Sequence, residues 1–220
     1  MTFTGTSYDV VTVDLDRARV RALTRDDAGR PIASFAHLRE VVGRSLAVAT
    51  NAGIFEPGLV PTGLFVADGR EMTPINTTTG EGNFYLQPNG VFAIDDAGAW
   101  ISPTAAFRSV GRAPRQATQS GPLLVSGGVI HASFRSDSTS TVIRNGVGVV
   151  SPRRVVLAIS NEPVNLKTFA TLFLERLECD DALYLDGAIS GMYAPSLGRE
   201  DLDRGPYAGF VVVEVAPQPD

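Results

Sequence analysis

Apolar and polar residues alternate in many short stretches of this chain, and residues typical of turns separate the stretches. Residues 8–25 alternate well enough for two strands that break near residues 14–17. Residues 63–100 predict further short strands, joined by a Pro-Asn-Gly turn and an Asp-Asp-Ala-Gly turn. Other stretches predict strands within 45–50, 121–134, 141–160, 181–187 and 207–215. The pattern is that of a strand-rich protein.

Two segments have helical spacing instead. The first runs from Ser34, a residue suited to an N-cap, to Gly43, which suits a helix end. The second covers residues 165–178 and begins at Asn165, again a capping residue. Its apolar residues fall on one face and predict core packing: Leu166, Phe169, Ala170, Phe173 and Leu177. We therefore expect an α+β fold, in which residues 1–220 form a single domain of mixed, mostly antiparallel sheet with two main helices packed on it.

Composition and charge narrow the function classes. The 220 residues are 44% hydrophobic, which is typical of a globular protein with one sizeable core. The formal net charge of −5 and the absence of a basic run argue against a nucleic-acid partner. No apolar run approaches the ~20 residues of a membrane-spanning helix. Localisation stays open: cytoplasmic if Met1 is the native start, secreted or periplasmic if a signal peptide has been removed.

Several common catalytic and metal-binding motifs are missing from the sequence. There is no phosphate-binding loop, no His-Glu-x-x-His and no Gly-x-Ser-x-Gly. Cys179 is the only cysteine, so no disulfide framework or thiolate metal site is expected, and a buried structural thiol is favoured. With only His37 and His131 as histidines, no metal is predicted, although an assisting divalent ion stays open.

Polar residues beside glycines recur at the ends of the predicted strands. The set comprises Asn51, Asn83, Asn89, Gln119, Ser120, Arg144, Asn145 and Asp186. Each one alone fits a turn or a surface position; Asp186-Gly187 in particular is a common turn dipeptide. Together, the amides, the guanidinium and the carboxylate favour an anionic or polyhydroxyl ligand.

Five blocks of this sequence carry a recognisable pattern in a fixed order: residues 49–69, 80–92, 119–134, 144–150 and 181–190. Together they resemble the phosphodiester glycosidase family, and its bacterial branch is the closer likeness. The resemblance runs from about Tyr8 to the C-terminus. It implies a hydrolase that cleaves a glycosyl-1-phosphodiester bond and releases a sugar from a phosphate-linked acceptor. The expected partner is a small molecule or glycan that carries a phosphodiester, and the oligomeric state stays open.

The same resemblance implies roles for individual residues. Family members carry an Asp-Gly-Gly-x-Ser corner, and here residues 186–190 read Asp-Gly-Ala-Ile-Ser, with Ala188 in place of one glycine. Asp186 would stabilise the developing positive charge at the anomeric carbon or activate water, and Arg144 would hold the phosphate bidentately. His131 would donate a proton or bind a hydroxyl. The remaining residues implied to bind substrate are Asn51, Gln119, Ser120, Asn145, Gly187 and Ser190.

These expectations make one geometric prediction and leave two alternatives open. Asn51, Gln119, Arg144 and Asp186 come from distant segments and should converge on one cleft. A non-catalytic glycan- or sugar-phosphate-binding protein, for example in exopolysaccharide or cell-envelope metabolism, would use the same polar set. A hydrolase with Ser120 as nucleophile would need a nearby base, and the sequence offers no obvious triad.

Overall fold

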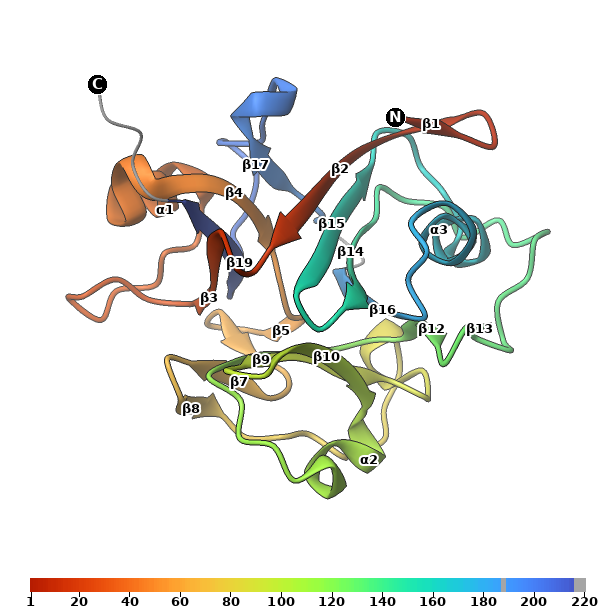
Figure 1. Cartoon of the computed structure of the whole chain (residues 1–220), viewed down its shortest axis with the longest axis horizontal. Helices are drawn as coiled ribbons and strands as arrows, with labels where there is room; N and C mark the ends of the chain where they lie inside the picture. The colour runs from red at the N-terminus through yellow and green to blue at the C-terminus, as the bar shows by residue number, and fades with distance from the viewer. Residues whose placement is uncertain (187–188, 216–220) are drawn as a thin grey trace.

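The computed structural model describes residues 1–186 and 189–215, which form three larger β-sheets, a two-stranded hairpin and three short α-helices (Figure 1). Every strand pairing among these residues is antiparallel. The expected single α+β domain with mostly antiparallel strands is confirmed, and its strands divide among separate sheets.

We call the seven-stranded sheet the large sheet. Its strands, in spatial order, are β1 (Thr2–Phe3), β2 (Thr6–Asp14), β15 (Arg154–Ser160), β14 (Asn145–Ser151), β16 (Asp181–Asp186), β12 (Leu123–Ser126) and β13 (Val129–Ile130). The five-stranded β9 sheet has the order β10 (Gly98–Pro103), β9 (Gly90–Asp95), β11 (Gln116–Ser120), β7 (Phe65–Ala67) and β8 (Arg70–Thr73). The five-stranded β4 sheet has the order β18 (Arg199–Glu200), β17 (Met192–Ala194), β4 (Leu46–Asn51), β19 (Phe210–Val215) and β3 (Ala18–Leu23). Strands β5 (Phe55–Glu56) and β6 (Val60–Pro61) form the hairpin.

The α-helices are α1 (Phe35–Val42), α2 (Thr104–Phe107) and α3 (Leu166–Thr171). Short 3₁₀ turns cover Gly43–Ser45, Asn83–Tyr85, Arg108–Val110 and Pro195–Leu197, and a π-helical turn covers Leu172–Arg176. The helices lie at the periphery, with the sheets between them (Figure 1). The sequence therefore identified the helical segments near residues 34–43 and 165–178, and all of the helices are short.

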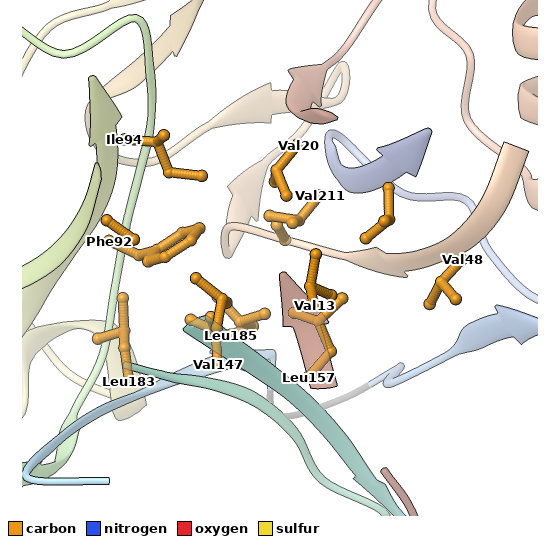
Figure 2. Close-up of a cluster of buried hydrophobic side chains, with 14 of the residues drawn as sticks. Val13, Val20, Val48, Phe92, Ile94, Val147, Leu157, Leu183, Leu185 and Val211 are labelled. Atoms are coloured by element: carbon orange, nitrogen blue, oxygen red, sulfur yellow. The ribbon is translucent and has the colours of Figure 1, made fainter. Parts of the chain in front are cut away.

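One apolar core joins the three sheets. Figure 2 shows side chains from all of them pointing toward one another: Val13, Val147, Leu157, Leu183 and Leu185 from the large sheet, Val20, Val48 and Val211 from the β4 sheet, and Phe92 and Ile94 from the β9 sheet. Fully burying one such side chain stabilises the fold by about 1.5–3 kcal/mol. All three sheets contribute side chains to this core. The inner face of each sheet is therefore buried only when the other two sheets are in place.

The outer face of each sheet packs against a helix. Helix α3 covers the large sheet, where Phe169 and Phe173 meet Tyr184 and Val156. Helix α1 covers the β4 sheet, and Phe107 of α2 covers the β9 sheet. The central strands, such as β15 and β16, are therefore buried on both faces, which explains the near-continuous apolar runs in the sequence.

The α3 region shows how the chain meets the large sheet. Asn165 caps the helix as predicted, since its side chain accepts a hydrogen bond from Thr168 N at 2.9 Å. The predicted apolar stripe faces the sheet: Phe169, Ala170 and Phe173 are fully buried, and Leu166 and Leu177 are partly buried. After Thr171 the helix widens into the π-helical turn and leads to Cys179, which is buried as expected. A side chain at Gly148 would place its Cβ 2.5 Å from the Cys179 sulfur, so only glycine allows this approach.

Candidate active site

Four of the predicted site residues meet where the large sheet and the β4 sheet end side by side. Asn51 is the last residue of β4, Asn145 is the first of β14, and Asp186 is the last of β16. Ser190 follows β16 after the corner. All four are at least nine-tenths buried; the most exposed of them, Asp186, has 4% of its surface accessible. The strand ends therefore bring together side chains that are up to 139 positions apart (51 to 190).

A β-bulge turns Asp186 toward this meeting point. Gly146 pairs with Tyr184, but Asn145 pairs with Asp186, so Leu185 is an extra residue in β16. Leu185 lies in the shared core with Leu183, and the Asp186 carboxylate contacts β4 on the same side. Without the bulge, simple alternation would put Asp186 on the α3 side with Tyr184. Bulges commonly re-aim side chains next to active sites.

Asn51 holds the carboxylate and is itself fixed by its neighbours. Its Nδ2 donates to Asp186 Oδ2 at 2.7 Å. Its Oδ1 accepts from Gly191 N at 2.8 Å and from Asn145 Nδ2 at 3.0 Å. A backbone N–H can only donate, so the Gly191 bond determines which amide atom is oxygen. The Asn51 N–H groups therefore face the Asp186 carboxylate.

Asn145 and Ser190 complete the cluster. Asn145 Nδ2 also lies 2.7 Å from Thr50 Oγ1 and 2.8 Å from Asn51 O. Ser190 Oγ lies 3.2 Å from Asn145 Oδ1 and 3.1 Å from Asp186 O, which ties the two ends of the corner together. Ile189 N lies 3.4 Å from Asp186 Oδ1. Gly187, predicted to let the backbone approach a substrate, and Ala188 lie outside the described residues.

The β9 sheet also reaches this place, through Ser120. Its hydroxyl donates to Leu185 O, the carbonyl of the bulge residue, at 2.9 Å. Ser120 is completely buried. Within the described part of the chain no side-chain base is a hydrogen-bond partner of Ser120. Among the described residues, the Ser120 hydroxyl is therefore engaged with a carbonyl and has no base beside it to activate it as a nucleophile.

The Gln119 side chain lies on the opposite face of β11 from the Ser120 side chain. Its Oε1 accepts from Leu64 N at 2.9 Å and Asn76 N at 2.8 Å. Its Nε2 donates to Asn76 O at 2.6 Å and Thr104 Oγ1 at 3.2 Å. These bonds use the amide's full hydrogen-bonding capacity. Gln119 therefore holds the segment around residues 64–76 against β11. It is not part of the carboxylate cluster.

Arg144 lies on the α3 side of the large sheet. It directly precedes Asn145, and the pleat sends the two side chains to opposite faces. Its Nε donates to Val164 O at 2.7 Å, Nη1 to Tyr184 OH at 2.6 Å, and Nη2 to Ser140 O at 2.9 Å. Burial raises the pKa of Tyr184, so this phenol is neutral and can accept. Arg144 is 1% exposed.

His131 uses both ring nitrogens within the protein. Nε2 lies 3.0 Å from Gln87 O, and Ser133 N donates to Nδ1 at 3.2 Å. These partners require the tautomer with the proton on Nε2. Burial lowers the pKa of His131, and the ring stacks on Phe134 with centroids 4.6 Å apart. A neutral imidazole that holds the loop after β13 is the state that the geometry supports.

Sequence reasoning missed several residues that support the site. Thr50 Oγ1 donates to Gly191 O at 2.9 Å, and Arg204 Nη1 donates to Ser190 O at 3.2 Å. Tyr184 carries the link between β16 and Arg144. Thr50 and Tyr184 lie inside the sequence blocks that carry the family resemblance, next to residues that were singled out.

Among the described residues, no group of three His, Cys, Asp or Glu side chains could hold a metal ion.

Comparison with known proteins identifies the family. A model of the phosphodiester glycosidase family matches residues 44–209. The chain belongs to this family. The uncharacterized protein YigE of Escherichia coli is 34% identical over 167 residues, which cover 76% of this chain and 65% of YigE. This member of the phosphodiester glycosidase family thus spans slightly less than two thirds of the length of YigE.

Solved structures share the fold. The catalytic domain of zebrafish N-acetylglucosamine-1-phosphodiester alpha-N-acetylglucosaminidase, auto-inhibited by its pro-peptide, has a TM-score of 0.62 at 15% identity, covering 96% of this chain and 83% of that chain. A hypothetical protein from Synechocystis has a TM-score of 0.59 at 15% identity, covering 98% and 61%. A putative exported protein from Burkholderia pseudomallei has a TM-score of 0.53 at 12% identity, covering 94% and 73%. In the described part of this family member, no helix combines the length and apolar character needed to cross a bilayer.

Proposed function

We propose that this protein hydrolyses glycosyl-1-phosphodiesters and releases the sugar from its phosphate-linked acceptor. The observation that carries the proposal is the Asp186 carboxylate, held by Asn51 Nδ2 at 2.7 Å at the junction of the three sheets. Membership of the phosphodiester glycosidase family supports the reaction class.

The reaction needs a negative group beside the anomeric carbon. As the bond from that carbon to the phosphate oxygen breaks, its electron pair leaves with the phosphate and positive charge develops on the sugar. Asp186 stabilises this charge and accepts a proton from the water that adds to the anomeric carbon. A phosphate monoester is a good leaving group, so little proton donation to it is required. A neutral His131, engaged on both nitrogens, is compatible with this simple scheme.

The other polar residues divide into two groups in this proposal. Asn51, Asn145, Ser120 and Ser190 hold the carboxylate and its corner, because their polar atoms already bond to one another or to β16. Arg144 provides positive charge for the phosphate at the end of the large sheet where β14 begins and β16 ends, although its guanidinium and the Asp186 carboxylate lie on opposite faces of that sheet. Gln119 stays outside the set, since its amide is fully used elsewhere.

A diester of a sugar 1-phosphate with 4-nitrophenol tests the proposal. Cleavage on the sugar side gives free sugar and colourless 4-nitrophenyl phosphate, which turns yellow only after a phosphatase is added. Cleavage on the other side of phosphorus gives 4-nitrophenol directly. We expect the first outcome, and hydrolysis in ¹⁸O-water should place the label in the sugar.

The matched variants are Asp186→Asn and Asp27→Asn, the latter at an exposed position. Asparagine keeps an oxygen for Asn51 but removes the charge, so turnover by Asp186→Asn should fall by roughly 100-fold or more. Asp27→Asn should match the wild type. Near wild-type turnover in Asp186→Asn would show that Asp186 is only a turn residue. Binding of the diester without turnover by the wild type would favour the sugar-phosphate-binding alternative.

A further inference from the structure

A small pocket lies on the α3 side of the large sheet, beside Arg144. Its volume is about 120 Å³. That is well below the ~300–1,000 Å³ of pockets for whole small molecules, so it suits one compact group. Its polar lining residues are Ser133, Arg135, Ser138, Ser140, Arg144 and Lys167. Three of these side chains are cationic and the other three carry hydroxyl groups.

Arg144 contributes a buried positive charge that has no ion-pair partner among the described residues. Its hydrogen-bond partners are two carbonyls and the Tyr184 phenol, all neutral. No carboxylate within the described ranges lies within ion-pair distance of this guanidinium. A guanidinium stays charged in proteins and has more N–H groups than these bonds use. A buried cation of this kind is stabilised by an anion placed against it.

Lys167 adds a second positive charge to the same pocket. It is the only lysine of the chain and lies half-buried at the start of α3. Within the described ranges its ammonium has no hydrogen-bond or ion-pair partner. Arg135 is the third cation, but Asp137 pairs with it at 2.9 Å and both are well exposed. The uncompensated charge at the pocket thus belongs to Arg144 and Lys167.

We propose that this pocket binds a phosphoryl group, with Arg144 at its floor and Lys167 at its side. Several cations and hydroxyls around a compact space match the oxygens of phosphate better than the two oxygens of a carboxylate. Lys167 is then a substrate-binding residue that the polar loop pattern did not reveal. That the phosphoryl group is part of the sugar phosphodiester rests on the proposed function.

The pocket lies at the end of the large sheet that also carries the Asp186 carboxylate. Arg144 directly precedes Asn145 of the carboxylate cluster, and Tyr184 stands two residues before Asp186. The pocket and the carboxylate therefore lie at the same end of the large sheet, at the start of β14 and the end of β16, but on opposite faces of the sheet, so a diester that occupies both must pass around this end.

Protection of Lys167 from acetylation tests phosphate binding without any turnover. The protein is acetylated with and without inorganic phosphate at constant ionic strength, with chloride as the reference, and peptides are quantified by mass spectrometry. We expect saturating phosphate to slow acetylation of Lys167 about tenfold, while the Met1 amine, which bonds to Tyr8 O, serves as an internal control. Equal acetylation of Lys167 in phosphate and chloride overturns the proposal.

Two variants assign the binding to the pocket. Calorimetric affinity for inorganic phosphate should fall about tenfold in Lys167→Gln, as expected for loss of one charge-assisted hydrogen bond. Arg17→Gln removes an exposed cation in the turn between β2 and β3 and should leave the affinity unchanged. Equal affinities in the two variants would contradict a role for Lys167.

Inhibition kinetics separate this inference from the proposed function. Competitive inhibition by phosphate, together with a raised KM in Lys167→Gln, identifies the phosphate of the diester as the occupant. Inhibition that is not competitive identifies free phosphate instead. If phosphate protects Lys167 but no diester is hydrolysed, the pocket stands and the proposed function fails. If diesters are hydrolysed and phosphate gives no protection, the pocket assignment fails alone.

Discussion

Exchanging the Asn51 side-chain nitrogen for an oxygen would turn its hydrogen bond with Asp186 into a repulsion between two carboxylates. Asn51→Asp keeps the size of the side chain and the oxygen that accepts from Gly191 N and Asn145 Nδ2. It replaces the N–H donor, 2.7 Å from Asp186 Oδ2, with a second carboxylate oxygen. Two buried carboxylates at this distance cannot both be ionised, so the folded variant takes up one proton that the unfolded chain does not bind.

The free energy needed to keep that proton bound determines how much stability the variant loses. An unfolded aspartate has a pKa of about 3.9, so holding one extra proton at pH 7 costs about 4 kcal/mol of unfolding free energy. Because the folded state binds more protons than the unfolded state, stability falls as pH rises, by about 1.4 kcal/mol per pH unit. Relative to the wild type, Asn51→Asp should lose up to about 4 kcal/mol at pH 7 and about 1 kcal/mol at pH 4.5.

Urea unfolding between pH 4.5 and 8 measures this difference. Asn161→Asp, the same change where Arg199 Nη1 donates to Asn161 Oδ1 at 2.6 Å, gives the new carboxylate a positive partner, so its stability should stay within about 1 kcal/mol of the wild type and should not fall as pH rises. A loss in Asn51→Asp that does not depend on pH, or that stays below about 1 kcal/mol at pH 7, would refute the reasoning. It would mean that Asn51 does not face the carboxylate in solution.

Two further predictions concern the α3 side and the loop after β13. Arg144→Lys keeps the charge but cannot reproduce the bonds to Val164, Tyr184 and Ser140, so steady-state kinetics on any hydrolysed diester should show a raised KM with a smaller change in kcat. An unchanged KM would count against a phosphate role for Arg144. Burial lowers the pKa of His131, so the folded protein loses stability as pH falls below about 6.5, where the unfolded imidazole binds a proton. In His131→Gln, urea unfolding should show a smaller loss between pH 7.5 and 5.5, and an equal loss would contradict the buried neutral state.

The sequence predicted most of the fold and part of the site. Turn dipeptides, capping residues and the apolar stripe led to the correct class and to the helical segments at Ser34 and Asn165. The division into three sheets could not be predicted, because alternation identifies strands but not their partners. The sequence blocks also led to Asn51, Asn145, Asp186 and Ser190, which the structure brings together.

Residue spacing could not reveal which side of a strand each polar residue would face. The extra residue Leu185 puts Asp186 and Tyr184 on opposite sides of β16, against simple alternation. Gln119 and Ser120 are neighbours in β11, so only one of them can face β16. Convergence of Gln119 on the carboxylate would have required a second bulge, and β11 pairs regularly with β9.

The hydrogen bonds of the carboxylate cluster also determine when the site can form during synthesis. Asn51 reaches partners 94, 135 and 140 residues further along the chain. Closing such long loops makes folding slow and dependent on the most distant segments. A ribosome must therefore release nearly the whole sequence before Asn51 meets Gly191, and until then the strand ends of β4 and β14 remain open to chaperones and proteases.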